Sequence, residues 1–331
     1  MAIKHVTVAG SGVLGSQIAF QVAFKGFDVT IYDINDDVID KAKTRIGGLA
    51  EIYASQIAGS QSQFSNLVKG TNYNANLLPG LPDAIIGRIQ DAEKVARETP
   101  ARISYATDLK TAVQNSDLVI EAIPELLDLK TKFYQQLSQV APSKTIFATN
   151  SSTLIPSQFS EATGRPKQFL ALHFANEIWK NNTAEIMGHA GTDANIYQTI
   201  VQFAKDIGMI AIEVKKEQPG YILNSILVPF LHAAQLLYLK GVGDPQTIDR
   251  TWMIATGSPM GPFAILDMVG IQTVYNIIQN YVATTGDPDF KQLATMMKTE
   301  YLDKGKLGVS SGEGFYHYPN PAFEDENFLK G

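Results

Sequence analysis

Polar and titratable side chains follow several β-like runs of this sequence at the point where each run ends. Glu121 ends the run "DLVIE", Asn150 and Ser152 follow "KTIFAT", and His173 ends "FLALH". If these runs are neighbouring strands of a parallel sheet, their carboxyl ends lie along one edge, which is where such sheets bind ligands. The sequence therefore predicts one crevice that holds a carboxylate, an amide, a hydroxyl and an imidazole.

Within this set His173 is the natural general acid/base, because free imidazole titrates near neutral pH. A catalytic imidazole usually needs an orienting group on its other ring nitrogen. Glu185, in the next β-like run "AEIM", is the best candidate. Such a pair can remove the hydroxyl proton of a secondary alcohol while a cofactor takes the hydride. A single strand-end histidine is more often structural, and Glu185 alone reads equally well as a surface charge, but the pairing favours catalysis.

Ser152, next to Asn150, has two interpretations. A helix predicted to begin at "STLIPSQF" would make Ser152 its N-cap, and capping is compatible with a role in binding. No G-x-S-x-G motif surrounds Ser152, which disfavours a serine hydrolase. No group of His, Asp and Glu residues has the spacing of metal ligands, so we expect no metal.

The first residues of the chain predict where a cofactor would bind. A short β-like run, "IKHVTVA", leads into Gly10, Gly12 and Gly15 in the spacing G-x-G-x-x-G. In this motif the first glycine allows a tight turn, the second lets a diphosphate approach the backbone, and the third lets the helix pack closely on the strand. The helix is predicted to begin at Val13, so the free N–H groups of Val13 and Leu14 favour a diphosphate.

The second β-like run, "FDVTIYD", ends in Asp33. A carboxylate here accepts hydrogen bonds from the adenosine ribose hydroxyls and repels the additional phosphate of NADP, so the sequence predicts NAD as cofactor. The strand, the helix and the acid all fall where the motif requires them, which makes three unrelated turn glycines the weaker interpretation. FAD remains an alternative at this point, because flavoproteins share the fingerprint.

Further β-like runs alternate with helical patterns up to residue 214. Strands are expected at 101–106, 116–123, 144–150, 168–174, 184–187 and 209–214. This alternation predicts an α/β fold with a Rossmann-type doubly wound, mostly parallel sheet. Later patterns are helical and separated by Gly and Pro, so we expect an NAD-binding domain over 1–215 and an all-helical domain over 216–331. Residues 46–87 break the regularity and predict a helix followed by an exposed loop.

Composition restricts the class of protein. The chain of 331 residues is 45% hydrophobic and carries a net charge of −6, which is typical of globular proteins and disfavours nucleic acid as a partner. Its most apolar stretch, residues 221–239, contains Asn, Pro, His and Gln and predicts a buried helix rather than a membrane span. The absence of cysteine excludes disulfides and zinc–thiolate sites. No signal peptide is expected, and the expected location is cytoplasmic.

Several stretches together resemble the L-3-hydroxyacyl-CoA dehydrogenase family, which includes the 3-hydroxybutyryl-CoA dehydrogenases. They extend over nearly the whole chain and comprise "VAGSGVLGSQIA", "VIEAIPE", "IFATNSST", "ALHFAN", "AEIM", "QPGYILNSILVPFL", "GSPMGPFAILDMVG" and "LGVSSGEGFYHY". The resemblance disfavours FAD. It implies an NAD-dependent oxidoreductase of fatty acid metabolism that acts on 3-hydroxyacyl-CoA. It also implies a homodimer whose helical domain closes over the active site.

The resemblance implies roles for individual residues as well. His173 would be the general acid/base and Glu185 its orienting partner, while Ser152 and Asn224 would hydrogen-bond the substrate. These four residues form the expected catalytic set.

Three further residues acquire expected roles from the same resemblance. Asn176 would support the histidine and the substrate pocket. Glu121 would lie near the nicotinamide ribose, and Asn150 is expected beside the cofactor as well.

The chain also departs from the family pattern. Glu177 stands where the family usually has Pro, Ser225 stands where it has Arg, and "SSGEGFY" replaces K-T-G-x-G-F-Y. Counting without gaps from Asp33 puts Leu49 and Gln56 at positions that contact CoA in the family. The phosphates of CoA are normally met by Lys or Arg, and residues 46–87 contain one lysine. The cations just upstream, which could serve instead, are Lys41, Lys43 and Arg45.

Three hypotheses therefore remain open. The favoured one is an NAD-dependent 3-hydroxyacyl-CoA dehydrogenase that acts on short chains. The second is a relative that oxidises a free 3-hydroxy acid of the gulonate or carnitine type, which the scarcity of cations favours. The third is an NAD-binding protein without catalysis, of the crystallin type, which the intact set of predicted catalytic residues disfavours.

Overall fold

The computed structural model describes residues 2–64 and 86–330. They form two compact units, Met1–Ile222 (unit 1) and Leu223–Gly331 (unit 2). The division thus falls after residue 222 and not after residue 215 as predicted from sequence. The last residues of unit 1 return to its sheet, where Tyr221 is buried against Met187 and Val214. The exposed loop predicted within 46–87 lies largely outside the described residues.

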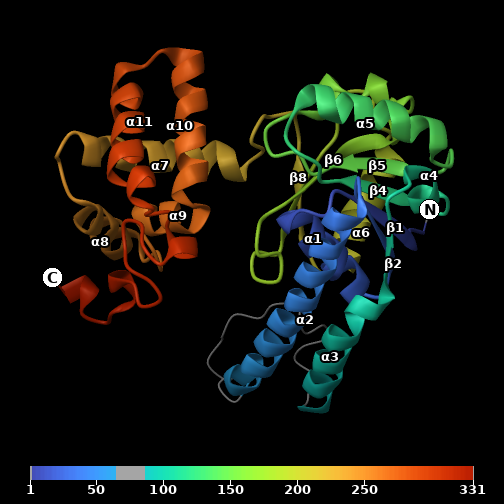
Figure 1. Cartoon of the computed structure of the whole chain (residues 1–331), viewed down its shortest axis with the longest axis horizontal. Coiled ribbons are helices and arrows are strands. Elements are labelled where there is room, and N and C mark those ends of the chain that lie inside the picture. Colours follow the sequence, from blue (N-terminus) through green and yellow to red (C-terminus); the bar gives the residue numbers. More distant parts are fainter. Residues whose placement is uncertain (1, 65–85, 331) are drawn as a thin grey trace. The chain divides into compact units, whose positions relative to one another are not determined.

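Unit 1 is built on an eight-stranded sheet with the strand order β3-β2-β1-β4-β5-β6-β7-β8 (Figure 1). The first six strands of this order are parallel, as predicted, whereas β7 is antiparallel to β6. The strands are β1 (His5–Ala9), β2 (Asp28–Tyr32), β3 (Ile103–Ala106), β4 (Leu118–Glu121), β5 (Ile146–Thr149), β6 (Phe169–Phe174), β7 (Thr183–Met187) and β8 (Ile210–Val214).

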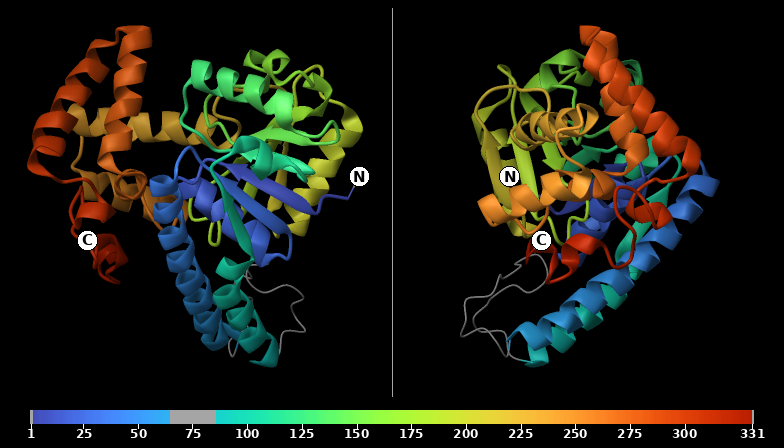
Figure 2. Two further views of the ribbon diagram at one scale, coloured as in Figure 1. Left: turned by 45° about the vertical axis from the view of Figure 1, so that its right-hand side comes forward. Right: turned by 90° about the vertical axis from the view of Figure 1, so that its left-hand side faces the viewer.

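Helices cover both faces of this sheet because successive strand residues point to opposite sides. On one face Val6 and Val8 pack with residues of α1 and α6, and on the other Val119 packs with residues of α4 and α5 (Figure 1). Helices α2 and α3 run side by side and extend away from the sheet (Figures 1 and 2). The helices are α1 (Val13–Phe24), α2 (Asp36–Phe64), α3 (Ile86–Glu98), α4 (Leu109–Val113), α5 (Leu127–Val140) and α6 (Ala194–Asp206).

Unit 2 is helical, as the sequence predicts. Helices α10 and α11 form an antiparallel pair (Figure 1). Its helices are α7 (Leu223–Leu239), α8 (Pro245–Thr256), α9 (Pro262–Val269), α10 (Ile271–Thr285) and α11 (Pro288–Glu300). Within residues 2–64 and 86–330, no helix has the length and apolar character required to cross a membrane.

Two buried aspartates organise unit 2 around the motifs "GSPMGPFAILDMVG" and "GEGFYHY". Asp249 of α8 accepts hydrogen bonds from the N–H groups of Phe263 and Ala264 at the start of α9, at 2.8 and 2.9 Å. Asp267 of α9 accepts hydrogen bonds from two backbone N–H groups of the second motif. A Cβ atom at Gly314 would lie 2.0 Å from Oδ1 of Asp267, so only glycine fits there. A Cβ at Gly261 would likewise lie 2.4 Å from Cγ of Asp249, so close packing around the two carboxylates accounts for one glycine in each motif, Gly261 and Gly314.

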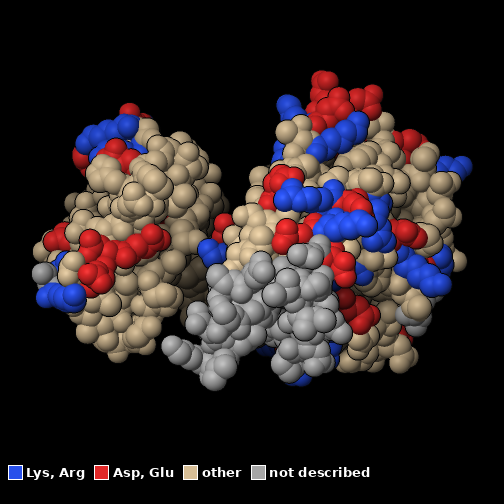
Figure 3. Space-filling view, turned by 90° about the horizontal axis from the view of Figure 1, so that it is seen from below, with Lys and Arg blue, Asp and Glu red and all other residues tan. Residues whose placement is uncertain are grey.

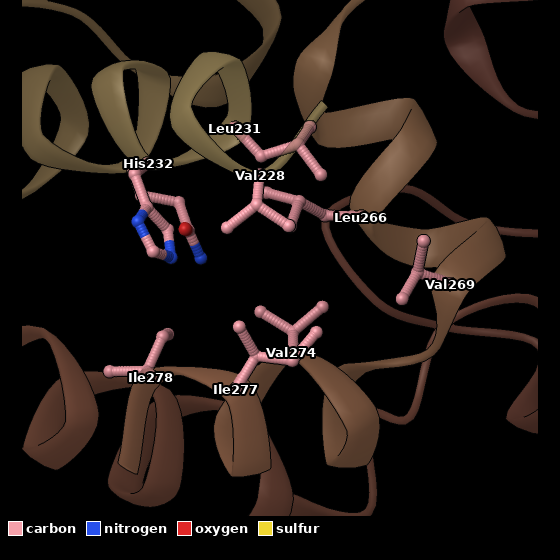
Figure 4. A pocket seen from close by; sticks show the side chains of 9 residues that line it. Val228, Leu231, His232, Leu266, Val269, Val274, Ile277 and Ile278 are labelled. Atoms are coloured by element: carbon pink, nitrogen blue, oxygen red, sulfur yellow. The ribbon is translucent and has the colours of Figure 1, made fainter. Parts of the chain in front are cut away.

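His232 is a core residue of unit 2. It reaches from α7 toward a small apolar pocket whose other side is formed by residues of α10, including Ile278 (Figure 4). Its ring packs edge-on against Tyr281 and Phe290. Burial lowers the pKa of His232, which favours the neutral ring. This environment indicates a structural role for His232.

Candidate active site

Each of the three glycines after β1 is favoured at its position for a different structural reason. Gly10 has a φ of 99°, and a Cβ there would lie 2.5 Å from the Ala122 carbonyl oxygen. A Cβ at Gly15 would lie 1.9 Å from the Gly10 carbonyl oxygen, so this glycine lets α1 pack on the turn. A Cβ at Gly12 would meet nothing within 4 Å and would instead occupy the adjoining cleft. Gly12 thus keeps space free where a diphosphate approaches the backbone.

The cleft beside these glycines has the lining that an adenine dinucleotide requires. Its volume is about 700 Å³, and Gly10, Gly12, Asp33 and Phe133 contribute to its walls. No described side chain caps the first turn of α1, which leaves its N–H groups, those of Val13 among them, for an anion. The residues present therefore fit NAD.

Asp33 lies at the end of β2, where the ribose hydroxyls would lie. Its Oδ2 accepts hydrogen bonds from the N–H and the hydroxyl of Ser11, at 2.7 and 2.6 Å. Arg45 of α2 donates to the Ser11 carbonyl oxygen at 2.7 Å. The carboxylate is thereby held beside the glycine turn. The predicted selection of NAD by Asp33 remains a prediction that this position supports.

The structure brings His173 and Glu185 together by strand register. His173 lies directly opposite Glu185 in the antiparallel β6–β7 pair, and its Nδ1 is 3.1 Å from Oε2 of Glu185. Residues 175–182 between these strands are too few for a crossover helix, which accounts for the antiparallel return. Both side chains are about 95% buried. If Nδ1 carries the proton that Glu185 accepts, Nε2 is left with a lone pair.

Nε2 of His173 faces the hydroxyl of Ser152 at 3.2 Å. Ser152 lies in the loop after β5, and this loop begins no α-helix. The expectation of a helix starting at Ser152 is therefore wrong, because only the 3-10 turn Pro156–Gln158 forms there. Pro156 has no backbone N–H to donate to a helix. The backbone N–H groups of residues 152–154 donate hydrogen bonds to a single side-chain carboxylate. The side chain of Ser152 is thus aimed at His173.

That carboxylate belongs to Glu125, a residue that sequence reasoning missed. Its Oε1 accepts hydrogen bonds from the Ser151 and Thr153 hydroxyls and from the N–H of Ser152, at 2.5–2.9 Å. Burial alone would raise the pKa of Glu125, but these hydrogen bonds and the Lys130 ammonium outweigh it and lower the pKa. Glu125 therefore stays ionised and fixes the loop that carries Ser152. Its position inside "VIEAIPE", just past the end of a strand, was the available signal.

The expected contact between Glu121 and the nicotinamide ribose does not fit this structure. Glu121 is fully buried and forms an ion pair with Lys130, which is itself 1% exposed. Its other oxygen accepts a hydrogen bond from the Thr149 hydroxyl at 2.8 Å. Burial raises the pKa of Glu121, although Lys130 and Thr149 act in the opposite direction. Glu121 therefore belongs to a closed cluster below the strand ends.

Asn150 and Asn176 occupy the strand-end region but play different local roles. Oδ1 of Asn150 accepts the N–H of Phe174 at 3.0 Å, which ties the end of β5 to β6. Asn176 has an exposed side chain, and its carbonyl accepts a hydrogen bond from the Asn181 amide. The two ring nitrogens of His173 face Glu185 and Ser152, so neither is left for a hydrogen bond with Asn176. Any support of His173 by Asn176 is therefore indirect. Cofactor binding by Asn150 and substrate binding by Asn176 remain predictions.

Glu177 explains one departure from the family pattern. Its φ is 56°, in the left-handed region that the ring of proline cannot adopt. Its carbonyl accepts the N–H groups of Lys180 and Asn181, which shapes the turn into β7. The loop after β6 therefore follows a path on which proline would be excluded.

Asn224 lies in unit 2, at the start of α7. Its expected hydrogen bond to substrate therefore remains a prediction.

The charge pattern of α2 bears on the substrate. In Asp36–Phe64 every cation falls in the first ten residues: Lys41, Lys43 and Arg45. Lys43 is paired with Asp40 at 2.9 Å. Leu49, expected at a CoA-contacting position, is 6% exposed and belongs to the core, whereas Gln56 is exposed. Figure 3 shows Lys and Arg interspersed with Asp and Glu over unit 1.

Comparison with known proteins matches both parts of the chain to one family. Residues 5–80 and 84–218 match the NAD binding domain of 3-hydroxyacyl-CoA dehydrogenase, and residues 220–318 match the C-terminal domain of the same family. The mitochondrial hydroxyacyl-coenzyme A dehydrogenase of Rattus norvegicus is 32% identical over 316 residues, covering 96% of this chain and 91% of that protein.

Two solved structures are similar over the whole chain. A diketoreductase described as a dual catalyst of dicarbonyl compounds is 50% identical, with a TM-score of 0.80, covering 96% of this chain and 100% of that one. The (S)-3-hydroxybutyryl-CoA dehydrogenase PaaH1 from Ralstonia eutropha is 26% identical, with a TM-score of 0.69 and the same coverage.

Proposed function

The chain belongs to the 3-hydroxyacyl-CoA dehydrogenase family, and we propose that it interconverts an L-3-hydroxyacyl-CoA and the corresponding 3-oxoacyl-CoA. It is an NAD-dependent oxidoreductase, and NAD is its cofactor. The substrate assignment is ours. It is supported by the histidine–glutamate pair at the carboxyl end of the sheet, beside a serine hydroxyl.

The residues of this chain would handle the proton of the reaction. In the oxidation direction, Nε2 of His173 accepts the proton of the substrate hydroxyl, which lies within reach of both Nε2 and the Ser152 hydroxyl. The Glu185 carboxylate stabilises the imidazolium that forms and holds the ring plane. In the reduction direction the imidazolium returns this proton to the developing alkoxide, and Ser152 donates a hydrogen bond to the same oxygen.

The cofactor would be held by the cleft described above. The glycine turn and the first turn of α1 would hold its diphosphate, and Asp33 would hold its adenosine ribose. When bound, the nicotinamide supplies or accepts the hydride.

The single observation that carries the proposal is the aligned set Glu185–His173–Ser152, with separations of 3.1 and 3.2 Å. A side chain that merely filled the core would not need a carboxylate on one ring nitrogen and a hydroxyl on the other. This arrangement also disfavours a non-catalytic NAD-binding protein.

A second candidate function is the reduction of a free dicarbonyl compound or 3-oxo acid that carries no CoA. Two observations favour it. The diketoreductase is 50% identical to this chain, against 26–32% for the two CoA-dependent enzymes compared. In α2, no cation follows Arg45 up to Phe64, although CoA phosphates are usually met by Lys or Arg.

NADH consumption distinguishes the two candidates. Acetoacetyl-CoA, free acetoacetate and a dicarbonyl ester of similar size would be compared at equal concentrations. The proposal expects kcat/KM for acetoacetyl-CoA to exceed that for free acetoacetate by at least about ten-fold, which corresponds to about 1.4 kcal/mol of transition-state binding. Equal values, or turnover of the free compounds only, would overturn the CoA assignment and support the second candidate.

We further propose a homodimer in the cytoplasm. Several large apolar side chains of unit 2 are exposed in the single chain, Val242 and Ile226 by 70% and 67%. Exposed apolar side chains of this kind favour contact with another protein surface. Fractionation of the source cells would test the location.

A further inference from the structure

One residue of unit 1 contacts the ring of His173 and the loop that carries Ser152, and the N–H of the residue after it binds Glu185, although no role was predicted for it from the sequence. Tyr221 follows the Pro219–Gly220 turn after β8 and is 1% exposed. Its φ of 53° lies in the left-handed region, which a bulky residue rarely adopts. Such strain persists only where the surroundings determine the conformation, and it occurs frequently at functional sites.

The ring of Tyr221 lies on the imidazole of His173. The ring centroids are 4.6 Å apart and the ring planes differ by 12°, so the two rings are stacked. Glu185 and Ser152 fix the two nitrogens of the imidazole within its own plane. The stacked phenol ring restricts the remaining freedom, which is the tilt of the imidazole out of that plane.

The hydroxyl of Tyr221 reaches the serine loop. It donates a hydrogen bond to the Ser151 carbonyl oxygen at 2.7 Å. Burial and the nearby carboxylates of Glu125, Glu185 and Glu121 raise the pKa of Tyr221, so the phenol keeps its proton and remains a donor. Because Ser152 follows Ser151 directly, this bond helps to fix the distance between the Ser152 hydroxyl and His173.

The left-handed backbone conformation of Tyr221 helps to position Glu185. It turns the chain so that the N–H of Ile222 donates to Oε1 of Glu185 at 2.9 Å. The other oxygen of Glu185 faces His173. Ring, hydroxyl and backbone therefore act on three different elements, namely β6, the loop after β5, and β7.

From these contacts we propose that Tyr221 is a positioning residue for the dehydrogenase reaction, setting the plane of His173 and the distance from His173 to Ser152. This inference rests on the proposed function. It predicts that loss of the ring and loss of the hydroxyl have different effects on the reaction, because the ring stacks on His173 and the hydroxyl binds the Ser151 carbonyl. A displacement of about 1 Å in such a set can lower the rate by about 100-fold.

The test uses two variants of Tyr221 and one matched control in the full chain. Tyr221→Phe keeps the stacked ring and removes the hydrogen bond to Ser151, whereas Tyr221→Leu removes both. The control is Tyr197→Phe, since the hydroxyl of Tyr197 also donates to a backbone carbonyl, that of Ile186 in β7, at 3.1 Å. NADH affinity, kcat, KM, the pH profile of kcat and the NMR signals of the His173 ring protons are measured for each.

The expected result is graded. Tyr221→Phe lowers kcat by about ten-fold and leaves the shielded His173 signals in place, because the aromatic ring is retained. Tyr221→Leu lowers kcat by about 100-fold, moves these signals downfield and shifts the pH profile of kcat. KM changes less than kcat, NADH affinity is unchanged in both, and Tyr197→Phe behaves like the unaltered chain.

Two results would overturn the proposal. One is a Tyr221→Leu variant with the kcat and pH profile of the unaltered chain. The other is a loss of NADH affinity that parallels the loss of kcat, which indicates general destabilisation. Should the unaltered chain reduce no 3-oxo compound at all, the proposed function fails, while the His173 signals still decide whether Tyr221 holds the ring.

Discussion

His173 has one ring nitrogen toward Glu185 and the other toward Ser152, so replacing it removes the only group placed to exchange a proton there among the described residues. We expect His173→Gln to lower kcat by about 10²- to 10⁴-fold, the usual contribution of general acid–base catalysis. NADH affinity should persist, because His173 is not among the residues that line the dinucleotide cleft. Steady-state kinetics and NADH fluorescence titration measure both effects.

The control for this variant is His317→Gln, because the His317 side chain is 84% exposed and no role in the reaction is assigned to it. It should keep the kcat of the unaltered chain. Full turnover by His173→Gln would show that another group moves the proton.

A second single-residue variant, at Asp33, tests whether the protein selects NADH over NADPH. Its carboxylate lies beside the glycine turn, where the additional phosphate of NADP would meet a negative charge. Asp33→Ala should therefore reduce the ratio of kcat/KM for NADH to that for NADPH by at least about ten-fold, since close like charges cost on the order of 1 kcal/mol or more.

The matched control is Asp28→Ala, which removes the same charge from the other end of β2, where Asp28 is exposed. An unchanged cofactor ratio in Asp33→Ala would contradict the role of Asp33, and a similar drop in both variants would indicate a nonspecific charge effect.

At the scale of elements, the pair Glu121–Lys130 joins β4 to α5. Neither side chain is more than 1% exposed. Lys130→Met would leave a buried carboxylate without its cation, so we expect the free energy of unfolding to fall by about 3–5 kcal/mol. Urea denaturation followed by circular dichroism measures this change.

The double variant Glu121→Gln/Lys130→Met should recover part of the loss, because it leaves no buried charge. Lys94→Met serves as the control, since Lys94 and Glu98 form a solvent-exposed pair on α3, and it should cost under about 1 kcal/mol. A cost for Lys130→Met as small as that of the control would show that burial of the pair is unimportant.

The contact of α8 with α9 predicts a pH dependence of stability. Burial raises the pKa of Asp249 to about 6, and Asp267 adds to the rise, against the hydrogen bonds from Phe263, Ala264 and Tyr316. Folding therefore favours protonated Asp249. The resulting stabilisation is complete below about pH 4, where the unfolded carboxyl is also protonated, and is lost as pH rises through about 6.

The pKa of Asp267 is raised as well, so Asp267 makes its own contribution to the pH dependence of stability. Comparison with Asp249→Asn isolates the contribution of Asp249. Between pH 4 and 7 the stability of the unaltered chain relative to the variant should fall by on the order of 3 kcal/mol. Calorimetric unfolding across this range provides the measurement, and a difference that stays constant with pH would refute the raised pKa.

At the scale of the whole molecule, the prediction concerns assembly. The chain has a mass of 36.1 kDa, and unit 2 leaves apolar side chains such as Val242 and Ile254 exposed. Light scattering after size exclusion should therefore give twice this mass at micromolar concentration. A particle with the mass of one chain would contradict the proposed homodimer.

Much of the fold could be predicted from sequence because its signals are local. Each expected strand is present within a few residues, and α1 ends just before Gly26, which has a φ of 97°. Helix α3 was not predicted, although Ala92, Val95 and Ala96 recur in it at helical spacing, and it packs against α2.

The candidate site could be predicted in part. His173 and Glu185 were expected to pair because a catalytic imidazole usually needs an orienting group on its other nitrogen and Glu185 lies in the next β-like run. Glu125, Lys130 and Tyr221 were missed, because their contacts join segments separated by up to 70 residues. The sequence also gave no indication that Glu121 would face a buried lysine and not the cofactor.

By itself, then, the sequence determined the alternation of strands and helices, the glycine turn with its acid, and the family of the chain. These features depend on periodicity and on backbone conformations that particular residues favour, so they can be recognised in short segments. Only the tertiary structure decided which side chains share the site. The antiparallel return of β7, the burial of Glu121 and the left-handed turn at Tyr221 arise from packing between distant segments, and no local pattern encodes them.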